Sequence, residues 1–160
     1  MVCNCGHILF WCHEMKLKKR ILLQCSTAVN RDAVSRNVHD GAEFITIKSY
    51  TLPDNIVMNG GLYAVDQVNN ALPSLERSLA PVEHPTDGQG NFILASDPHA
   101  INNFYAGAYN VNVQREGNRI RVDKEINVTE ALKSERGKRL LDRIEDIETN
   151  DNANSIDVVN

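Results

Sequence analysis

Residues 108–128, AYNVNVQREGNRIRVDKEINV, contain the pattern that most restricts how this chain can fold. Apolar residues alternate with polar ones on both sides of the turn formers Glu116-Gly117-Asn118. Successive strand side chains point to opposite faces, so this alternation predicts an antiparallel hairpin with one apolar and one solvated face. The alternating positions are Tyr109, Val111 and Val113 before the turn, and Ile120, Val122, Lys124 and Ile126 after it. Such a hairpin is typical of an antiparallel sheet or an open barrel.

An amphipathic helix is predicted directly after the hairpin, over residues 127–148. Asn127 and Glu130 can form a capping box at its start, or Thr129 can cap it. Gly137 weakens the helix centre by about 1 kcal/mol relative to alanine, which indicates a bend or close packing there. The apolar stripe consists of Val128, Ala131, Leu132, Leu140, Leu141, Ile144 and Ile147.

Other elements are predicted from shorter patterns. EFITIKSYTL, residues 43–52, predicts a strand, and AVDQVNNALPSL, residues 64–75, predicts a short helix that ends before Pro73. Asp97-Pro98 predicts a capped helical turn, and SIDVV at residues 155–159 starts like a strand. We therefore expect a poorly ordered extension and linker over residues 1–42, followed by one α+β domain over residues 43–160.

Composition excludes several classes of protein. The net charge of −4 argues against broad binding of nucleic acid, which needs a basic surface. No apolar run reaches the length of a membrane-spanning helix. The basic stretch KLKKR and the apolar residues after it imitate a signal peptide, but Gln24 interrupts the apolar part. We therefore expect a cytoplasmic protein.

All the cysteines lie within the first 25 residues, at positions 3, 5, 12 and 25. With His7 and His13 they invite a zinc interpretation, because thiolates and imidazoles are preferred zinc ligands. Their spacing matches no standard zinc finger, so reduced thiols on a loosely ordered leader are the alternative interpretation. We expect no metal and no cofactor.

The segment LAPVEHP, residues 79–85, holds the histidine that best fits a chemical role. Pro85 biases the backbone of His84 toward an extended conformation, which gives the imidazole a rigid mounting at the end of a strand. The alternative is a turn histidine bonded to backbone. Asp97 and His99 are further polar candidates, which we interpret first as loop-capping residues.

The order of elements, taken with three motifs, resembles the prohead (capsid maturation) serine proteases of tailed bacteriophages and their uncharacterised relatives. These motifs are MNGGLYAVDQVNNAL, LAPVEHP, and the hairpin AGAYNVNVQREGNRIRVDKEINV followed by GKRLLDRIEDIE. The resemblance covers residues 43–160. It implies the fold shared with herpesvirus assemblins, a compact, mostly antiparallel open β-barrel with packed helices. It also implies a serine endopeptidase that cleaves scaffold and major capsid proteins inside the assembling prohead, in the cytoplasm of the bacterial host.

By this resemblance the catalytic histidine is His84, which would take the proton of the nucleophilic serine. The serine after the long helix is Ser155, although Ile156-Asp157-Val158 stand where Ser-x-Gly is expected. A second alignment places the serine at Val159 or Asn160, or beyond residue 160 in an incomplete domain. The resemblance also implies a homo-oligomer, without membrane or direct nucleic-acid contact. A non-catalytic head-assembly protein that retains the protease fold is the alternative function.

Overall fold

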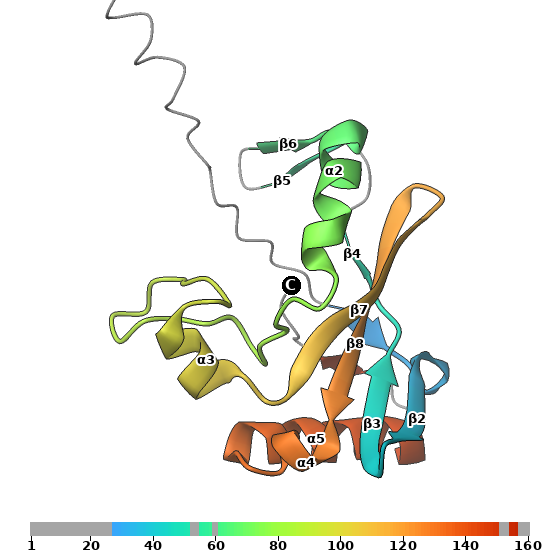
Figure 1. Cartoon of the computed structure of the whole chain (residues 1–160), viewed down its shortest axis with the longest axis vertical. Coiled ribbons are helices and arrows are strands. Elements are labelled where there is room, and N and C mark those ends of the chain that lie inside the picture. The colour runs from blue at the N-terminus through green and yellow to red at the C-terminus, as the bar shows by residue number, and fades with distance from the viewer. Residues whose placement is uncertain (1–26, 52–54, 59–60, 151–153, 157–160) are drawn as a thin grey trace, which may run out of the picture.

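The computed structural model describes residues 27–51, 55–58, 61–150 and 154–156, and Figure 1 shows the chain. The structure is mixed α+β, and its largest sheet curls into a half-barrel. All strand pairs within the described residues are antiparallel. The predicted α+β class with antiparallel strands is therefore confirmed at this level of detail.

Strand β8 lies at the centre of the largest sheet. One edge of β8 pairs with β7. The other edge pairs with β3 along one part of its length and with β4 along another. Strand β2 pairs with the outer edge of β3. The strands are β2 (Val34–His39), β3 (Ala42–Ile47), β4 (Tyr50–Thr51), β7 (Ala108–Glu116) and β8 (Arg119–Asn127). The predicted strand over 43–52 is thus found as two pieces along one edge of β8, which lets the sheet bend between them.

The prediction of a linker over residues 26–42 is wrong where the structure describes it. Residues 27–29 form β1 (Thr27–Val29), residues 31–33 form a 3-10 turn, and β2 follows. Strand β2 is exposed along most of its length, so its sequence carries no apolar alternation. Asp40 and Gly41 both have positive φ, 49° and 76°, as the tight turn between β2 and β3 requires. That Asp-Gly pair was the missed signal.

The predicted hairpin over residues 108–128 is confirmed in its two strands and its turn, but the prediction of a solvated polar face is wrong at Asn110 and Asp123, which are fully buried. Strands β7 and β8 pair through the turn at Gly117, whose φ is 63°. One irregularity was not predicted: the register shifts between Val111 and Gln114, where Asn112 takes a left-handed φ of 55°. This bulge bends β7 and contributes to the curl of the sheet.

Residues 77–82 extend the sheet beyond β7. The amide of Arg77 donates to the carbonyl of Asn110 at 2.7 Å, and the amide of Asn110 donates to the carbonyl of Ser78 at 2.9 Å. Further along, the amide of Ala80 donates to the carbonyl of Ala108 at 3.0 Å, and Leu79 stands opposite Tyr109. The segment that precedes His84 is therefore the outer strand of the sheet on this side.

Two helices precede and follow the His84 region. Helix α2 (Val65–Leu75) includes Pro73, so the predicted end before the proline is wrong. Pro73 lies in the last turn, where its missing N–H removes only one helical hydrogen bond. Helix α3 (Pro98–Phe104) begins as predicted, with the Asp97 side chain accepting from the amide of His99 at 2.8 Å.

The predicted helix over 127–148 is found as two helices, α4 (Val128–Ala131) and α5 (Glu135–Asn150). Asn127 caps α4 by accepting from the amide of Glu130 at 3.1 Å. The helices are so close that a Cβ on Gly137 would lie 2.0 Å from the carbonyl oxygen of Ala131. The close packing predicted at Gly137 is therefore confirmed, and the break between the helices allows it.

Two small sheets complete the described structure. Strand β9 (Asn154–Ile156) pairs with β1, and β5 (Ile56–Met58) pairs with β6 (Gly61–Tyr63). Strand β9 overlaps the start of the strand predicted at 155–159, whose last residues lie outside the described part. None of the described helices is long and apolar enough to cross a membrane.

The apolar residues form two buried clusters. The larger cluster joins the sheet to α4 and α5, and the smaller cluster joins the β7–β8 hairpin to α2. The first contains Val29, Ile45, Ile47, Ala80, Val82, Ala106, Ala108, Ile126, Ala131, Leu140, Ile144 and Ile147, and the second contains Tyr63, Val68, Ile120 and Val122. Helix α5 thus packs against the segment that leads to His84, through Ala80 and Val82.

We expect Gly137→Ala to lower the free energy of unfolding by about 2–3 kcal/mol, because an added methyl group would collide with the backbone at Ala131. The gain in helix propensity, about 1 kcal/mol, offsets only part of this cost. Urea denaturation measures the change. Gly88→Ala is the control, since a Cβ there meets nothing within 4 Å. Equal stability of the two variants would contradict the packing described for α4 and α5.

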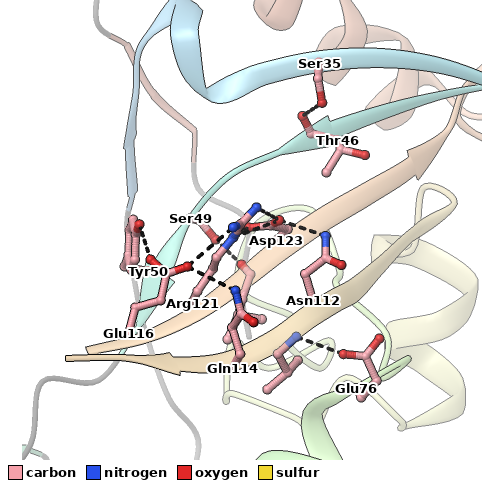
Figure 2. Close-up of polar contacts among 12 residues, drawn as sticks. Ser35, Thr46, Ser49, Tyr50, Glu76, Asn112, Gln114, Glu116, Arg121 and Asp123 are labelled. Atoms are coloured by element: carbon pink, nitrogen blue, oxygen red, sulfur yellow. Dashed lines mark hydrogen bonds and ion pairs between the residues drawn. The ribbon is translucent and has the colours of Figure 1, made fainter. Parts of the chain in front are cut away.

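A buried ion pair lies on β8, and Figure 2 shows its surroundings. The guanidinium of Arg121 donates to both carboxylate oxygens of Asp123, with the shortest contact at 2.6 Å, and Asp123 is fully buried. Asn112, at the bulge of β7, donates to the same carboxylate at 2.9 Å. Arg121 also contacts Glu116, which accepts from the hydroxyl of Tyr50 at 2.7 Å. The network ties β4, β7 and β8 together beside the hairpin turn.

We expect Asp123→Asn to lower the free energy of unfolding by about 2–4 kcal/mol, because Arg121 loses its buried carboxylate partner and keeps only the longer contact with Glu116. Arg121 is partly exposed, so the loss lies below that of a fully buried pair. Chemical denaturation at neutral pH measures it. Asp142→Asn, at an exposed position, should change stability by less than about 0.5 kcal/mol. A loss at Asp123 no larger than that of this control would contradict the stabilising role of the pair.

Candidate functional site

The position of His84 is set by the outer strand of the sheet and the turn that ends it. Residues 77–80 pair with β7, the amide of Val82 donates to the carbonyl of Phe104 at 2.9 Å, and Glu83 then takes a left-handed φ of 66°. This conformation costs a non-glycine residue about 1–2 kcal/mol, and it turns the chain away from the strand direction. Pro85 is fully buried just after the histidine. The imidazole is therefore held between a strained turn and a buried proline, as the sequence predicted for a rigid mounting.

The ring of His84 is half-buried and lies against Phe92. The two rings meet edge to face, with their centroids 5.8 Å apart. The Nδ1 atom has no access to solvent and no hydrogen-bond partner within the described residues. A buried ring nitrogen without a partner is costly, so this atom is the feature of the site that calls for an explanation. The alternative of a turn histidine bonded to backbone is not supported at Nδ1.

A short loop closes over this ring. The amide of Ile93 donates to the carbonyl of Pro85 at 3.0 Å, and Thr86 stands opposite Phe92. At the tip, one carboxylate oxygen of Asp87 accepts from the amide of Asn91 at 2.9 Å, and the Asn91 side chain donates to the other at 3.0 Å. These bonds hold the pKa of Asp87 below its usual value of 3.8. The loop thus fixes Phe92 beside His84.

Arg136 of α5 braces the turn before His84. Its guanidinium lies 3.1 Å from the carboxylate of Glu83 and donates to the carbonyl of Asn103. The same guanidinium stands over the ring of Phe104 at 4.2 Å, a distance typical of a cation–π contact. One side chain thereby connects α5, the end of α3 and the strained turn. The side chain of Glu83 is half exposed as well as ion-paired.

Asn110 fixes the other end of the segment that carries His84. Besides its two backbone bonds to this segment, the side chain of Asn110 donates to the hydroxyl of Ser78 at 2.8 Å. Its carbonyl oxygen accepts from the buried ammonium of Lys124 at 2.6 Å. Asn110 of β7 therefore connects Lys124 of the central strand β8 to Ser78 of the outer strand by side-chain hydrogen bonds.

Ser155 lies in β9, where its backbone is paired opposite Ala28 of β1. Its side chain falls outside the described part of the structure, as do Val159 and Asn160. The pairing of His84 with Ser155 therefore stays a prediction. Asp97 and His99 are both placed: Asp97 caps α3, and His99 is exposed, with its Nδ1 atom 3.3 Å from the side-chain amide of Asn103. The interpretation of these two as capping or loop residues is confirmed for Asp97.

Two residues near His84 were missed by the sequence analysis. Arg136 belongs to a helix that was predicted from its apolar stripe, and its partner Glu83 lies far away in the sequence. Phe92 follows a polar loop, and its contact with His84 depends on the closure of that loop. Neither contact has a local sequence pattern. Only the Asp87-Gly88 pair, typical of a turn, indicated that the loop folds back.

No cluster of three or more histidine, cysteine or acidic side chains that could hold a metal ion occurs in the described ranges. The cysteines and the two histidines of the zinc interpretation lie outside those ranges. Comparison with known proteins adds no identification: no family model, no curated protein and no solved structure matches this chain. The resemblance to prohead proteases therefore rests on the motifs alone.

We expect the pKa of Asp87 to rise toward its usual value of 3.8 in Asn91→Ala, because the side chain of Asn91 is the main cause of its lowering. A lowered pKa in the folded state stabilises the loop above the usual pKa, and this contribution is lost as pH falls through the folded value. NMR titration of the Asp87 carboxyl group measures both. Gln89→Ala, which keeps its backbone amide, is the control. An unchanged titration in Asn91→Ala would contradict the loop geometry.

Proposed function

We propose that this chain is a prohead maturation protease, a serine endopeptidase in which His84 is the general base. The observation that carries the proposal is the buried Nδ1 atom of His84, which lacks a partner within the described residues. In a serine protease this nitrogen is bonded to an orienting group, and the opposite ring nitrogen faces the serine. The polar atom that would complete the site is therefore expected outside the described residues or in a second molecule.

The arrangement of elements gives further support. The resemblance implies an antiparallel open barrel with helices packed on it, and an antiparallel half-barrel covered by α4 and α5 is compatible with this expectation. His84 stands at the end of an outer strand and is braced from two sides, by Arg136 and by the loop that carries Phe92. A general base needs such fixed geometry, because proton transfer occurs over hydrogen-bond distance.

In the proposed reaction the hydroxyl oxygen of Ser155 attacks the carbonyl carbon of the scissile peptide bond. His84 takes the serine proton and then gives it to the leaving amine as the peptide bond breaks. Water then attacks the carbonyl carbon of the acyl-enzyme while His84 takes a proton from the water. His84 returns a proton to the serine oxygen as the bond between the acyl group and the serine breaks. The second alignment places the serine at or beyond Val159, in which case His84 keeps its role and Ser155 does not. Scaffold and major capsid proteins inside the prohead are the proposed substrates.

The alternative is a non-catalytic head-assembly protein that retains the fold. The same Nδ1 atom favours it in one respect, since the described residues supply no hydrogen-bond partner for this nitrogen. Without that partner the ring has no preferred tautomer for base catalysis. The alternative therefore predicts a folded chain whose serines are not activated.

We expect a fluorophosphonate probe to label the chain at Ser155, and the labelling rate to fall by at least about 100-fold in His84→Ala, because the base raises the nucleophilicity of the serine. Mass spectrometry of the labelled peptide identifies the serine, and Ser155→Ala should abolish labelling.

Two matched controls accompany this measurement. His99→Ala removes an exposed histidine and Ser96→Ala an exposed serine, and both should label at the unchanged rate. Labelling that persists in His84→Ala would overturn the role of His84. A folded chain that is not labelled at all would favour the structural alternative, unless a longer chain with a serine after Asn160 restores labelling. That second result would support the alternative alignment.

A further inference from the structure

A groove of about 310 Å³ runs along the first half of α5, beside the residues that precede His84. Val82 and Leu140 are buried and form its apolar part. Charged side chains of α5 and of the strained turn form the rest. The complete lining is Val82, Glu83, Arg136, Arg139, Leu140, Asp142 and Arg143.

The arginines of this groove differ in their ion pairs and hydrogen bonds. Arg136 is paired with Glu83, as described above. Arg139 and Arg143 are exposed, and neither has a hydrogen bond or an ion pair with another described residue. Asp142 is the remaining acidic side chain of the lining. The groove thus has a local positive surplus, in a chain whose net charge is −4.

The charges along α5 are mixed in order. Glu135 lies in the first turn, where an acidic side chain is favourable, and Arg136 and Arg139 follow in the first half. Arg143, Glu145 and Glu148 lie in the second half. The positive end of the helix dipole is at the N-terminus, where basic side chains are unfavourable. Arg139 and Arg143 also repel each other at a spacing of four residues. The charge of Arg139 is partly balanced by Glu135, four residues earlier, whose pKa it helps to lower. Pairing within the helix therefore accounts for Arg139 in part, and leaves its repulsion from Arg143, which also lines the groove.

We propose that the groove binds an acidic stretch of a polypeptide. Carboxylates of the bound segment pair with Arg139 and Arg143, and an apolar neighbour rests on Val82 and Leu140. Arginine suits this task because its planar guanidinium binds a carboxylate through two parallel hydrogen bonds. The inference concerns binding and does not require His84 to be catalytic.

The outer strand next to the groove indicates a polypeptide as the occupant. In segment 77–82, the backbone groups of Ser78 and Ala80 bond to β7, so those of Leu79 point to the other side. The backbone of Leu79 has no hydrogen-bond partner in the part of the chain that the structure describes. An extended peptide can add to such an edge through its own backbone. Three residues further on, Val82 enters the groove.

The test uses fluorescence anisotropy with two labelled decapeptides, one alternating glutamate and valine and the other alternating glutamine and valine. We expect the full chain to bind the glutamate peptide at least about 10-fold more tightly than the glutamine peptide, and less tightly as salt is raised. Arg139→Gln/Arg143→Gln should weaken binding of the glutamate peptide by about 5- to 10-fold. Both positions are exposed, so the folded state should persist, and thermal melting checks it.

Arg119→Gln is the matched control, because Arg119 is an exposed arginine at the tip of the hairpin, outside the groove. It should bind as the unchanged chain does, and so should His84→Ala, which separates this inference from the proposed protease function. Equal affinity for the two peptides, or no loss in the double variant, would overturn the proposal. Displacement of the peptide by a single-stranded oligonucleotide at lower concentration, with the same arginine dependence, would also overturn it in favour of a phosphate ligand.

Discussion

The structure depends on the pairing of β8 on both of its edges. A strand in this position is buried on its faces as well, so every polar side chain on it needs a partner. Asp123 and Lys124 are consecutive and therefore point to opposite faces, and each has one: Arg121 for the carboxylate and Asn110 for the ammonium. The two faces of the sheet are thus each fixed by a charged contact that an apolar residue could not provide. Apolar packing favours one register of the strands without excluding every other register. The charged contacts therefore help to specify which residues of β7 and β8 face each other.

A series of hydrogen bonds connects β8 to the candidate site. Lys124 holds Asn110, Asn110 holds Ser78, and the outer strand that begins there ends at Glu83 and His84. The strained φ of Glu83 persists because the surroundings over-determine it: β7 fixes the strand before it, Pro85 is buried after it, and Arg136 pairs with its carboxylate. Strain of this kind is found where a side chain must be presented in one direction. Here the strained turn sets the direction in which the chain continues to His84.

The sequence predicted the elements with strong periodicity and missed those whose stability comes from distant residues. The β7–β8 hairpin, the cap at Asp97 and the close packing at Gly137 each have a local cause, and each was predicted. Strand β2 was missed because an exposed edge strand has no apolar alternation, and its place in the sheet depends on β3. The break between α4 and α5 was missed because the apolar stripe is continuous in the sequence, whereas the chain turns at residues 132–134 and brings Gly137 against Ala131.

The candidate site divides in the same way. His84 could be found from Pro85 and the small apolar residues before it, whereas Arg136 and Phe92 could not, because both reach the histidine region only after α5 and the loop have folded onto the sheet. The groove beside them has the same origin, since it forms between the end of the outer strand and α5. Glu83 belongs to both features: its backbone turns the chain toward His84, and its side chain neutralises the first arginine of the groove. An acidic ligand would therefore meet Arg139 and Arg143 rather than Arg136, and the turn that positions His84 would stay in place when the groove is filled.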